Sequence, residues 1–396
     1  MPFIEQLLNG ENVEWKKLGE VCEIKTGKGV TKKNAISNGV YPIISGGKKP
    51  MDYINIHNRE ANTVTVSRVG ANAGYVNYIS ERFYLNDKCF SVISKKGNVF
   101  IPRFLYYALK KQEDNISSLQ SQGGVPTINT VKLGNILIPL PPLSVQHRIV
   151  EILDKFTELE AELEANLKAE LNCRKRQYEY YRNQLLSFDM LNKGGQKLND
   201  VKIMTLGDLG TFVRGSGLQK KDFTPTGVGC IHYGQIYTYY GTYAKKTKSF
   251  VSQEFALKAR KAKHGDLIIA TTSENDEDVC KAVAWLGDED IAVSSDACFY
   301  AHTMNPKYIA YYFQTELFQS QKRKFITGTK VRRVNAKDLA KIKIPLPPLS
   351  VQREIVEILD KFDTLCNSIS EGLPKEIELR RKQYEYYRNQ LLTFAQ

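Results

Sequence analysis

The sequence predicts an α+β protein in which two β-rich mixed α/β globules are joined by two long antiparallel helices that form a coiled coil. Three observations lead to this fold class: a duplicated helical segment, a regular spacing of apolar residues within it, and a basic, β-rich block before each copy. The chain has 396 residues, which is enough for several domains. Its two halves are therefore expected to be related by pseudo-twofold symmetry.

The duplicated segment is the strongest feature of the sequence. Residues 138–156 read IPLPPLSVQHRIVEILDKF and residues 344–362 read IPLPPLSVQREIVEILDKF, identical at 17 of 19 positions. Residues 174–188 recur as residues 380–394 with 12 of 15 identities. Both matches have an offset of 206 residues, so the diverged stretch between them has kept its length.

Apolar spacing predicts that each copy is one long helix. Apolar residues follow one another in steps of three or four from Val145 to Phe188, with a stutter near 163–174, which describes one face of an amphipathic helix. Pro142 blocks helix formation upstream, and Ser144, like Ser350 in the second copy, is a suitable N-cap. A helix of this length needs a partner for its apolar face, and the other copy is the obvious one.

Local sequence qualifies this helix pair in two ways. Gly372 and Pro374 predict a kink or a break in the second helix. The repeated tyrosines next to Leu185 favour packing or a protein interface over stacking on bases. The helix residues that we expect to serve packing or partner binding are Gln146, Ile149, Ile152, Phe156, Tyr178, Tyr181, Gln352, Ile355, Ile358, Phe362, Tyr384 and Tyr387.

The net charge of +13 is concentrated in the two blocks outside the helices. Residues 1–143 contain 18 Lys and Arg against 11 Asp and Glu, and residues 201–349 contain 22 against 14. The helical stretches 144–190 and 350–396 are nearly neutral. Two basic domains joined by neutral connectors are typical of a protein that binds a polyanion, although solubility alone also explains a basic surface.

These features divide the chain into globule, helix, globule and helix. Runs with β-type patterning and turn signals lie inside both globules, at 62–79 and 266–286. The two globules share a short motif at their start and another at their end, but the sequence between these motifs differs from one globule to the other. The predicted bounds are 1–143 for the first globule, 144–190 for the first helix, 191–343 for the second globule and 344–396 for the second helix.

Catalytic and metal-binding signatures are absent from the sequence. It contains neither an N-P-P-[FYW] or D-P-P-Y methyltransferase loop nor a G-x-x-x-x-G-K-[ST] phosphate loop. The five histidines are isolated from one another, and the seven cysteines never form a C-x-x-C pair. We therefore expect a chain without catalytic activity, metal or cofactor of its own. This argues against a self-sufficient enzyme such as a fused methyltransferase and nuclease.

Targeting signals are also missing. The N-terminal residues lack the apolar stretch of a signal peptide, and no apolar run is long enough to span a bilayer. Scattered, unpaired cysteines suit a reducing compartment. The sequence therefore predicts a cytoplasmic protein that does not associate with a membrane.

Polar loops rich in Lys, Arg and Gly are the candidate DNA-binding elements. Lys neutralises phosphates, Arg, Asn and Gln can read base edges, and Gly allows the backbone to approach closely. The candidates in the first globule are Lys25, Lys28, Lys32, Lys33, Lys48, Lys49, Ser67, Arg68, Asn72 and Gln122. Those in the second are Arg214, Ser216, Lys220, Lys221, Tyr233, Gln235, Lys330, Arg332 and Arg333.

The duplicated helix entry resembles the specificity subunits of type I restriction-modification systems. The Leu-Gly-Glu and Leu-Gly-Asp entries of the globules and the two Arg-Asn-Gln-Leu-Leu helix ends match the same family. The resemblance covers essentially the whole chain, and the motifs occur twice in the same order. The interruption at Gly372 and Pro374 departs from an unbroken second helix.

The resemblance implies that each globule is a target recognition domain for one half of a bipartite site in double-stranded DNA. The paired helices would set the distance between the half-sites and dock two methyltransferase subunits, which bind S-adenosylmethionine and methylate adenine. Restriction subunits, which are ATP-driven translocases and nucleases, would join the complex, so ATP and Mg²⁺ also belong to partner chains. The alternative is a coiled-coil scaffold that binds only proteins, for which no duplex DNA would be bound even with partners present.

Overall fold

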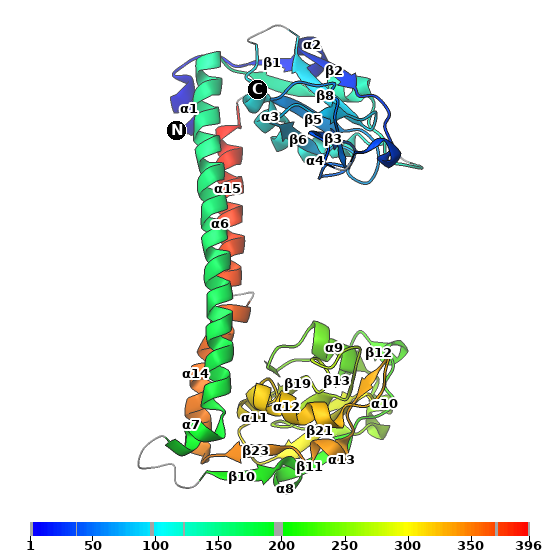
Figure 1. Cartoon of the computed structure of the whole chain (residues 1–396), viewed down its shortest axis with the longest axis vertical. Helices are drawn as coiled ribbons and strands as arrows, with labels where there is room; N and C mark the ends of the chain where they lie inside the picture. The colour runs from blue at the N-terminus through cyan, green and yellow to red at the C-terminus, as the bar shows by residue number, and fades with distance from the viewer. Residues whose placement is uncertain are drawn as a thin grey trace. The chain divides into compact units, whose positions relative to one another are not determined.

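The structure, a computed structural model, describes residues 3–36, 38–95, 99–121, 123–193, 201–368 and 371–394. The chain forms two compact units. Unit 1 contains Met1–Asn166 and Ile377–Gln396, and unit 2 contains Leu167–Glu376. Each unit therefore combines one globule with a segment of both repeated helices (Figure 1).

Globule 1 is built on a four-stranded antiparallel sheet and a smaller three-stranded one. The larger sheet has the strand order β2 (Cys22–Thr26), β8 (Cys89–Ser94), β5 (Thr63–Ser67) and β6 (Val76–Ile79). The smaller has the order β4 (Tyr53–Ile54), β3 (Tyr41–Ile44) and β7 (Tyr84–Leu85), with β3 and β7 parallel. Its helices are α1 (Phe3–Leu8), α2 (Leu18–Val21), η1 (Lys32–Asn34), α3 (Pro102–Lys111), α4 (Glu113–Ser118) and α5 (Thr130–Gly134).

Globule 2 repeats this plan with two five-stranded sheets. The first has the order β11 (Gly210–Arg214), β21 (Ala297–His302), β17 (Leu267–Ala270), β19 (Ala282–Trp285) and β14 (Tyr243–Ala244). The second has the order β12 (Phe223–Thr224), β15 (Ser249–Val251), β13 (Val228–Ile231), β20 (Ile291–Val293) and β16 (Lys261–Ala262). Strands β13 and β20 are parallel, as β3 and β7 are in globule 1. Strands β18 (Thr272–Ser273) and β22 (Arg332–Arg333) form a further short antiparallel pair.

The helices of globule 2 include several that match those of globule 1 in order. They are α8 (Leu206–Leu209), η2 (Lys220–Asp222), α9 (Tyr233–Thr238), α10 (Gln253–Lys258), α11 (Pro306–Tyr312), α12 (Glu316–Lys322), η3 (Arg323–Phe325) and α13 (Ala336–Leu339). A two-stranded antiparallel ribbon at the entry to the long helix also occurs in both units. Its strands are β1 (Glu14–Lys17) with β9 (Leu137–Leu140), and β10 (Lys202–Thr205) with β23 (Lys343–Leu346).

The first long helix is continuous and the second is broken. Helix α6 (Leu143–Leu185) is followed by the short α7 (Phe188–Lys193), whereas the second copy forms α14 (Leu349–Asn367) and α15 (Leu373–Leu391). Gly372 between them has φ +81°, and a Cβ there would lie 2.6 Å from the Thr364 carbonyl oxygen. Pro374 falls in the first turn of α15, where its missing N–H costs no hydrogen bond. The predicted break is confirmed.

Contacts within each unit show that the helix segments run antiparallel. In unit 1 the Thr157 hydroxyl lies 2.8 Å from the Tyr384 hydroxyl, and Glu164 forms an ion pair with Arg381 at 3.1 Å. In unit 2 the Tyr178 ring stacks on Phe362, with 6.1 Å between centroids. In Figure 1 helix α15 lies beside the first half of α6, and α14 lies beside its second half. The predicted α+β fold with a paired-helix connector is confirmed.

Each globule is fastened to the start of a long helix by a buried glutamine. Gln146 has no exposed surface, accepts the Ile101 N–H at 2.9 Å and donates to the Pro141 carbonyl at 2.9 Å. In the second copy, Gln352 accepts the Asn305 N–H at 2.9 Å and donates to a proline carbonyl at 2.8 Å. Because these carbonyls and N–H groups are shielded from water, losing the glutamine would leave them unsatisfied.

A carboxylate about two helical turns after each glutamine makes a second duplicated attachment. Asp154 pairs with Arg103 at 2.8 Å and accepts the Tyr107 hydroxyl at 2.5 Å. Asp360 pairs with a lysine of α11 at 2.6 Å and accepts the Tyr311 hydroxyl at 2.7 Å. Burial, followed by this hydrogen bond, raises the pKa of Tyr311, so its hydroxyl remains a donor. In each unit, two duplicated attachments therefore join the globule to the start of its long helix.

The hydrophobic cores follow the same division. One core of unit 1 joins strands β5 and β8 and helix α3 to Ile149 and Leu153 of α6 and to Phe394 at the chain end. One core of unit 2 joins β17, β21 and α11 to Tyr178 and to the buried face of α14. In the part of the chain that the structure describes, no helix has both the length and the apolar character needed to cross a membrane.

Candidate nucleic-acid interface

In unit 1 five separate loops meet at one surface, here called the first loop cluster: 27–33, 45–49, 68–73, 85–88 and the ends of 121–128. Loop 27–33 approaches loop 85–88 so closely that residue 27 must be glycine. A Cβ on Gly27 would lie 1.9 Å from the Leu85 carbonyl oxygen. The Lys28 N–H donates to that carbonyl at 3.0 Å, and the Asn86 side chain donates to the Val30 carbonyl at 2.8 Å.

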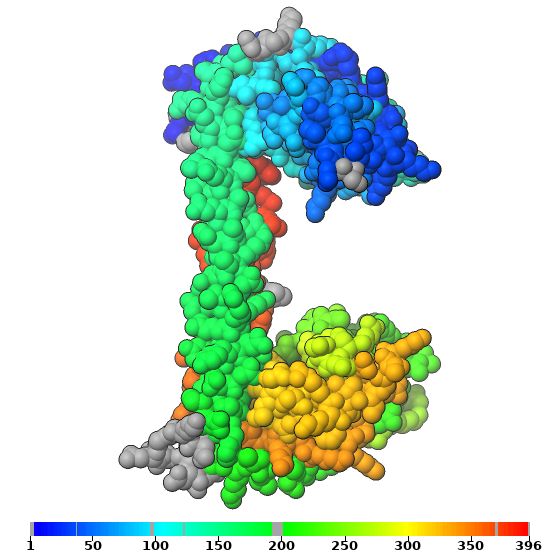
Figure 2. Space-filling view, in the orientation of Figure 1, coloured from blue at the N-terminus to red at the C-terminus, as the bar shows by residue number. Residues whose placement is uncertain are grey.

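Arg68 lies where three of these loops join. Its N–H donates to the Lys88 carbonyl at 2.8 Å, and its carbonyl accepts the Ile128 N–H at 2.9 Å. Its guanidinium donates to the Asp87 carbonyl at 3.3 Å. Asn72 donates to the Gly46 carbonyl at 3.3 Å and so ties in the remaining loop. Figure 2 shows that much of the blue chain, which contains the first two loops, forms the end of globule 1 farthest from α6.

Unit 2 builds the equivalent surface, here called the second loop cluster, from loops 214–217, 232–235, 271–278, 294–296 and 327–335. A Cβ on Gly215 would lie 2.1 Å from the Ser294 carbonyl oxygen, so this glycine repeats the close approach of Gly27. The Thr271 N–H donates to the Asp296 carbonyl at 2.9 Å, and the Thr271 carbonyl accepts the Val334 N–H at 3.1 Å. Thr271 therefore occupies the backbone position that Arg68 has in unit 1.

A pocket of about 300 Å³ opens within the second loop cluster. Arg214 and Arg333 line it together with Asp296, and both arginines are exposed. Arg214 donates to the Ser295 carbonyl at 3.0 Å, which fixes its direction. Two cations around a concave polar surface are suited to a phosphate or to the acceptor edge of a guanine.

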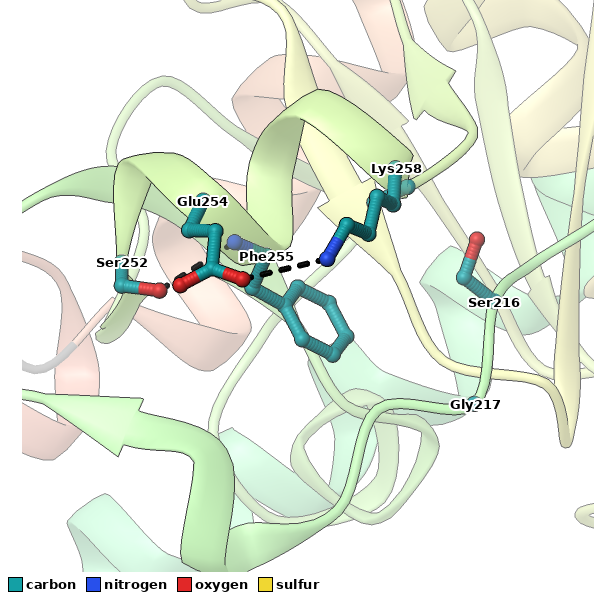
Figure 3. A pocket seen from close by; sticks show the side chains of 7 residues that line it. Ser216, Gly217, Ser252, Glu254, Phe255 and Lys258 are labelled. Carbon is teal, nitrogen blue, oxygen red and sulfur yellow. Dashed lines mark hydrogen bonds and ion pairs between the residues drawn. The ribbon is translucent and has the colours of Figure 1, made fainter.

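A neighbouring hollow of about 410 Å³ lies between Ser216 and helix α10. Figure 3 shows Ser216 and Gly217 on one side and Glu254, Phe255 and Lys258 on the other. Glu254 pairs with Lys258 at 3.1 Å, and the Ser216 hydroxyl accepts the Arg260 N–H at 2.8 Å. Because a Cβ on Gly217 would meet nothing within 4 Å, the backbone here is open to a ligand.

Loop 271–278, which contains the acidic stretch ENDED at residues 274–278, is held in place from inside. Lys322 has no exposed surface and donates to the Glu277 carbonyl at 3.0 Å and to the Val279 carbonyl at 2.9 Å. Burial lowers the pKa of Lys322. On the outside, Asp276 forms an ion pair with Arg332 at 2.8 Å. Lys322 and Arg332 therefore hold loop 271–278 from two sides.

The two clusters share a backbone frame but present different side chains. Lys28 lies between Gly27 and Gly29 in the first cluster, and Ser216 lies between Gly215 and Gly217 in the second. In the third loop, the backbone position that joins its neighbours is Arg68 in the first cluster and Thr271 in the second. The carbonyl that accepts the backbone N–H of this residue belongs to Lys88 in the first cluster and to Asp296 in the second.

Most of the predicted DNA-binding residues lie on or beside the clusters, and their side chains differ in exposure. Those with exposed side chains are Lys25, Lys28, Lys32, Lys33, Lys48, Lys49, Arg214, Lys220, Lys221, Lys330 and Arg333. Half-buried ones are Arg68, Asn72, Ser216, Tyr233, Gln235 and Arg332. Lys25 is paired with Glu23 at 2.7 Å, and Gln235 donates to the Ser249 hydroxyl at 2.7 Å.

Two predicted residues do not join this surface. Ser67 is only 2% exposed, because it lies in the fully buried strand β5, and its side chain has no surface for DNA. Gln122 lies outside the described residues. The structure adds Lys88, Thr271 and Asp296, which sequence reasoning missed because ordinary residues in short turns carried no signal.

The structure divides the predicted helix residues between buried and exposed positions. Gln146, Ile149, Tyr178, Gln352 and Ile355 are at most 5% exposed and pack inside their own unit, so a partner cannot reach them. Ile152, Phe156, Phe362 and Tyr384 are half-buried, whereas Ile358, Tyr181 and Tyr387 are at least 40% exposed. The buried members therefore serve packing, whereas the exposed ones are accessible to a partner.

Comparison with known proteins agrees with this architecture. The sequence profile described as "Type I restriction modification DNA specificity domain" matches residues 10–173 and 199–379. A candidate type I restriction enzyme specificity subunit of Haemophilus influenzae is 32% identical, over 99% of this chain and 98% of its own. The EcoR124I/EcoR124II specificity subunit of Escherichia coli is 30% identical, over 100% and 97%.

Solved structures share the fold at lower identity. A chain from a study of complex assembly and conformational transition in a type I restriction-modification system has a TM-score of 0.68 at 17% identity, over 96% of this chain and 98% of its own. The HsdS subunit of Thermoanaerobacter tengcongensis has a TM-score of 0.58 at 18% identity, over 97% and 96%. With its two matched domains and its duplicated helices, this chain belongs to the specificity subunits of type I restriction-modification systems.

Proposed function

We propose that each globule binds one half of an asymmetric, bipartite target in double-stranded DNA. The observation that carries this proposal is that the two loop clusters share one frame but differ in charge and hydrogen-bonding groups at matching positions. Donor and acceptor patterns on the major-groove edge distinguish the base pairs, so different side chains on one frame select different bases. Lys88 in one cluster and Asp296 in the other illustrate such a difference.

Within each cluster we assign two roles. Exposed lysines such as Lys28, Lys48 and Lys220 neutralise phosphates, because a flexible ammonium binds charge without reading sequence. Arg214 and Arg333 read base edges, because a guanidinium can form two parallel hydrogen bonds with guanine. Since the proposed substrate is chromosomal DNA, we place the assembled complex in the cytoplasm.

The helices are the proposed docking surface for two methyltransferase subunits. Support comes from a duplicated aromatic pair: Tyr180 and Tyr181 are 60% and 40% exposed, and Tyr386 and Tyr387 are 59% and 46% exposed. In each pair the ring centroids are 5.5 Å apart. Exposed tyrosines are typical anchors of protein interfaces. Each unit has one such tyrosine pair, which is consistent with two copies of the same partner. Restriction subunits would then bind to the complex of this chain with its methyltransferase subunits.

Catalysis is assigned to those partners, which would bind S-adenosylmethionine, ATP and Mg²⁺. The isolated chain is therefore expected to bind no S-adenosylmethionine and to methylate no DNA. Isothermal titration calorimetry of the purified chain with the cofactor measures this, with the chain assembled with its methyltransferase partner as positive control. Tight cofactor binding to the isolated chain would contradict the assignment.

Binding to duplex DNA is expected to weaken steeply with salt, because several lysines release counterions from the phosphates. A complex that makes six to ten phosphate contacts loses about 10³- to 10⁵-fold in affinity between roughly 50 and 200 mM salt. Fluorescence anisotropy with the assembled complex measures the slope. A flat plot, or no binding to any duplex, would favour the protein-binding scaffold instead.

A further inference from the structure

One small loop is closed in the same way in both units. The Ser121 N–H donates to the Thr127 carbonyl at 2.9 Å, and 206 residues later the Thr327 N–H donates to the Arg333 carbonyl at 2.9 Å. Glycines in the left-handed region turn the backbone within both loops, with φ +86° at Gly124 in the first. The two loops thus share one closing hydrogen bond at equivalent positions.

A valine is the only residue that these loops have in common. Residues 121–127 read SQGGVPT and residues 327–333 read TGTKVRR, and the single identity is Val125 with Val331. Val125 is 64% exposed and Val331 is 45% exposed. Neither side chain therefore belongs to the core, and the shared valine cannot be explained by packing.

Both valines lie on the loop clusters. The first loop is joined to Arg68 through the hydrogen bond from the Ile128 N–H, and a β-bridge pairs Val69 with Thr127. In the second, Lys330 and Arg333 flank Val331 with exposed cations. An apolar side chain is thus presented on a basic, polar surface that is suited to DNA.

Duplex DNA offers one apolar group on its major-groove base edges, the 5-methyl group of thymine. A valine side chain can cover this methyl group, whereas it can neither pair with a phosphate nor hydrogen-bond to a base. We infer that Val125 and Val331 each contact the 5-methyl group of one thymine, one in each half-site. This inference rests on the proposed function and adds to it the chemical group that the two loops read.

Replacing thymine with deoxyuracil removes only that methyl group and tests the contact. Once the methylated motif is known from genome sequencing, duplexes with a single deoxyuracil at each thymine position are titrated with the assembled complex. One position in each half-site is expected to bind about fourfold more weakly, the value for one buried methyl-sized group. All other positions are expected to be unaffected.

Two variants serve as controls for each other. With V331A the deoxyuracil effect should disappear in one half-site and persist in the other, and with V125A the pattern should be reversed. Both side chains are exposed, so neither substitution opens a cavity. An effect that survives both variants, a half-site without any thymine, or no deoxyuracil effect at all would overturn the inference. If the wild-type complex does not prefer its motif to a scrambled duplex, the proposed function itself fails.

Discussion

Replacing Arg333 with alanine is expected to weaken binding to the native target about ten- to a hundredfold and to relax specificity in one half-site only. The magnitude corresponds to the loss of one bidentate contact with a base, roughly 1–3 kcal/mol. The Arg333 backbone pairs with Thr327 through both its N–H and its carbonyl, and alanine keeps these bonds. The loss should therefore reflect recognition and not folding.

The measurement is a titration of the assembled complex against the native duplex and against duplexes with single substitutions in either half-site. R323A is a matched control, because Arg323 is an exposed cation of the same unit that is paired with Glu316 at 2.7 Å, outside the second loop cluster. A uniform loss over all sequences would show that Arg333 binds a phosphate. Relaxed specificity in both half-sites would contradict the assignment of one globule to one half-site.

Inserting one additional Glu-Leu-Glu-Ala into α6 is expected to widen the gap between the half-sites by one or two base pairs. Residues 158–165 already contain this tetrapeptide twice. Four residues nearly preserve the apolar stripe and lengthen the helix by about 6 Å. Duplex DNA rises about 3.4 Å per base pair. Torsional flexibility of the DNA and adjustment of the helix pair would absorb part of this change.

The methylated motif of the insertion variant, read over a whole genome, measures the gap. E162A, which changes the same segment without changing its length, should leave the gap unaltered. An unchanged gap in a fully active insertion variant would show that this segment is only a solvated helix with a leucine stripe. Altered bases within the half-sites would mean that the recognition residues lie elsewhere than in the globules.

The helical part of the fold was predictable because its signals are local. Apolar residues three and four apart marked α6, and Gly372 with Pro374 marked the break in the second copy. The sheets were less accessible, because the parallel pairing of β3 with β7 joins residues about forty positions apart without a helical crossover pattern. The hydrogen bonds of Gln146 were not predictable, because only the folded chain brings together the carbonyls that it binds.

The candidate site was predictable as a composition but not as a surface. Lysine-rich loops such as 27–33 and 45–49 were recognised from their charge, yet their assembly depends on contacts like that of Asn72 with Gly46. Arg68 and Thr271 share one role although their side chains have nothing in common, so no pattern could align them. Ser67 precedes Arg68 in the sequence, yet it is the last residue of strand β5, whose five residues are all buried.

The central claim is that this chain alone chooses the DNA target and does so with two different recognition surfaces. Sequencing of methylated adenines in the native genome, with and without this gene, tests it most directly. We predict a motif of two unlike half-sites separated by a gap of unspecified bases, which disappears when the gene is deleted. A motif that persists in the deletion strain, or one that is continuous or palindromic, would contradict it.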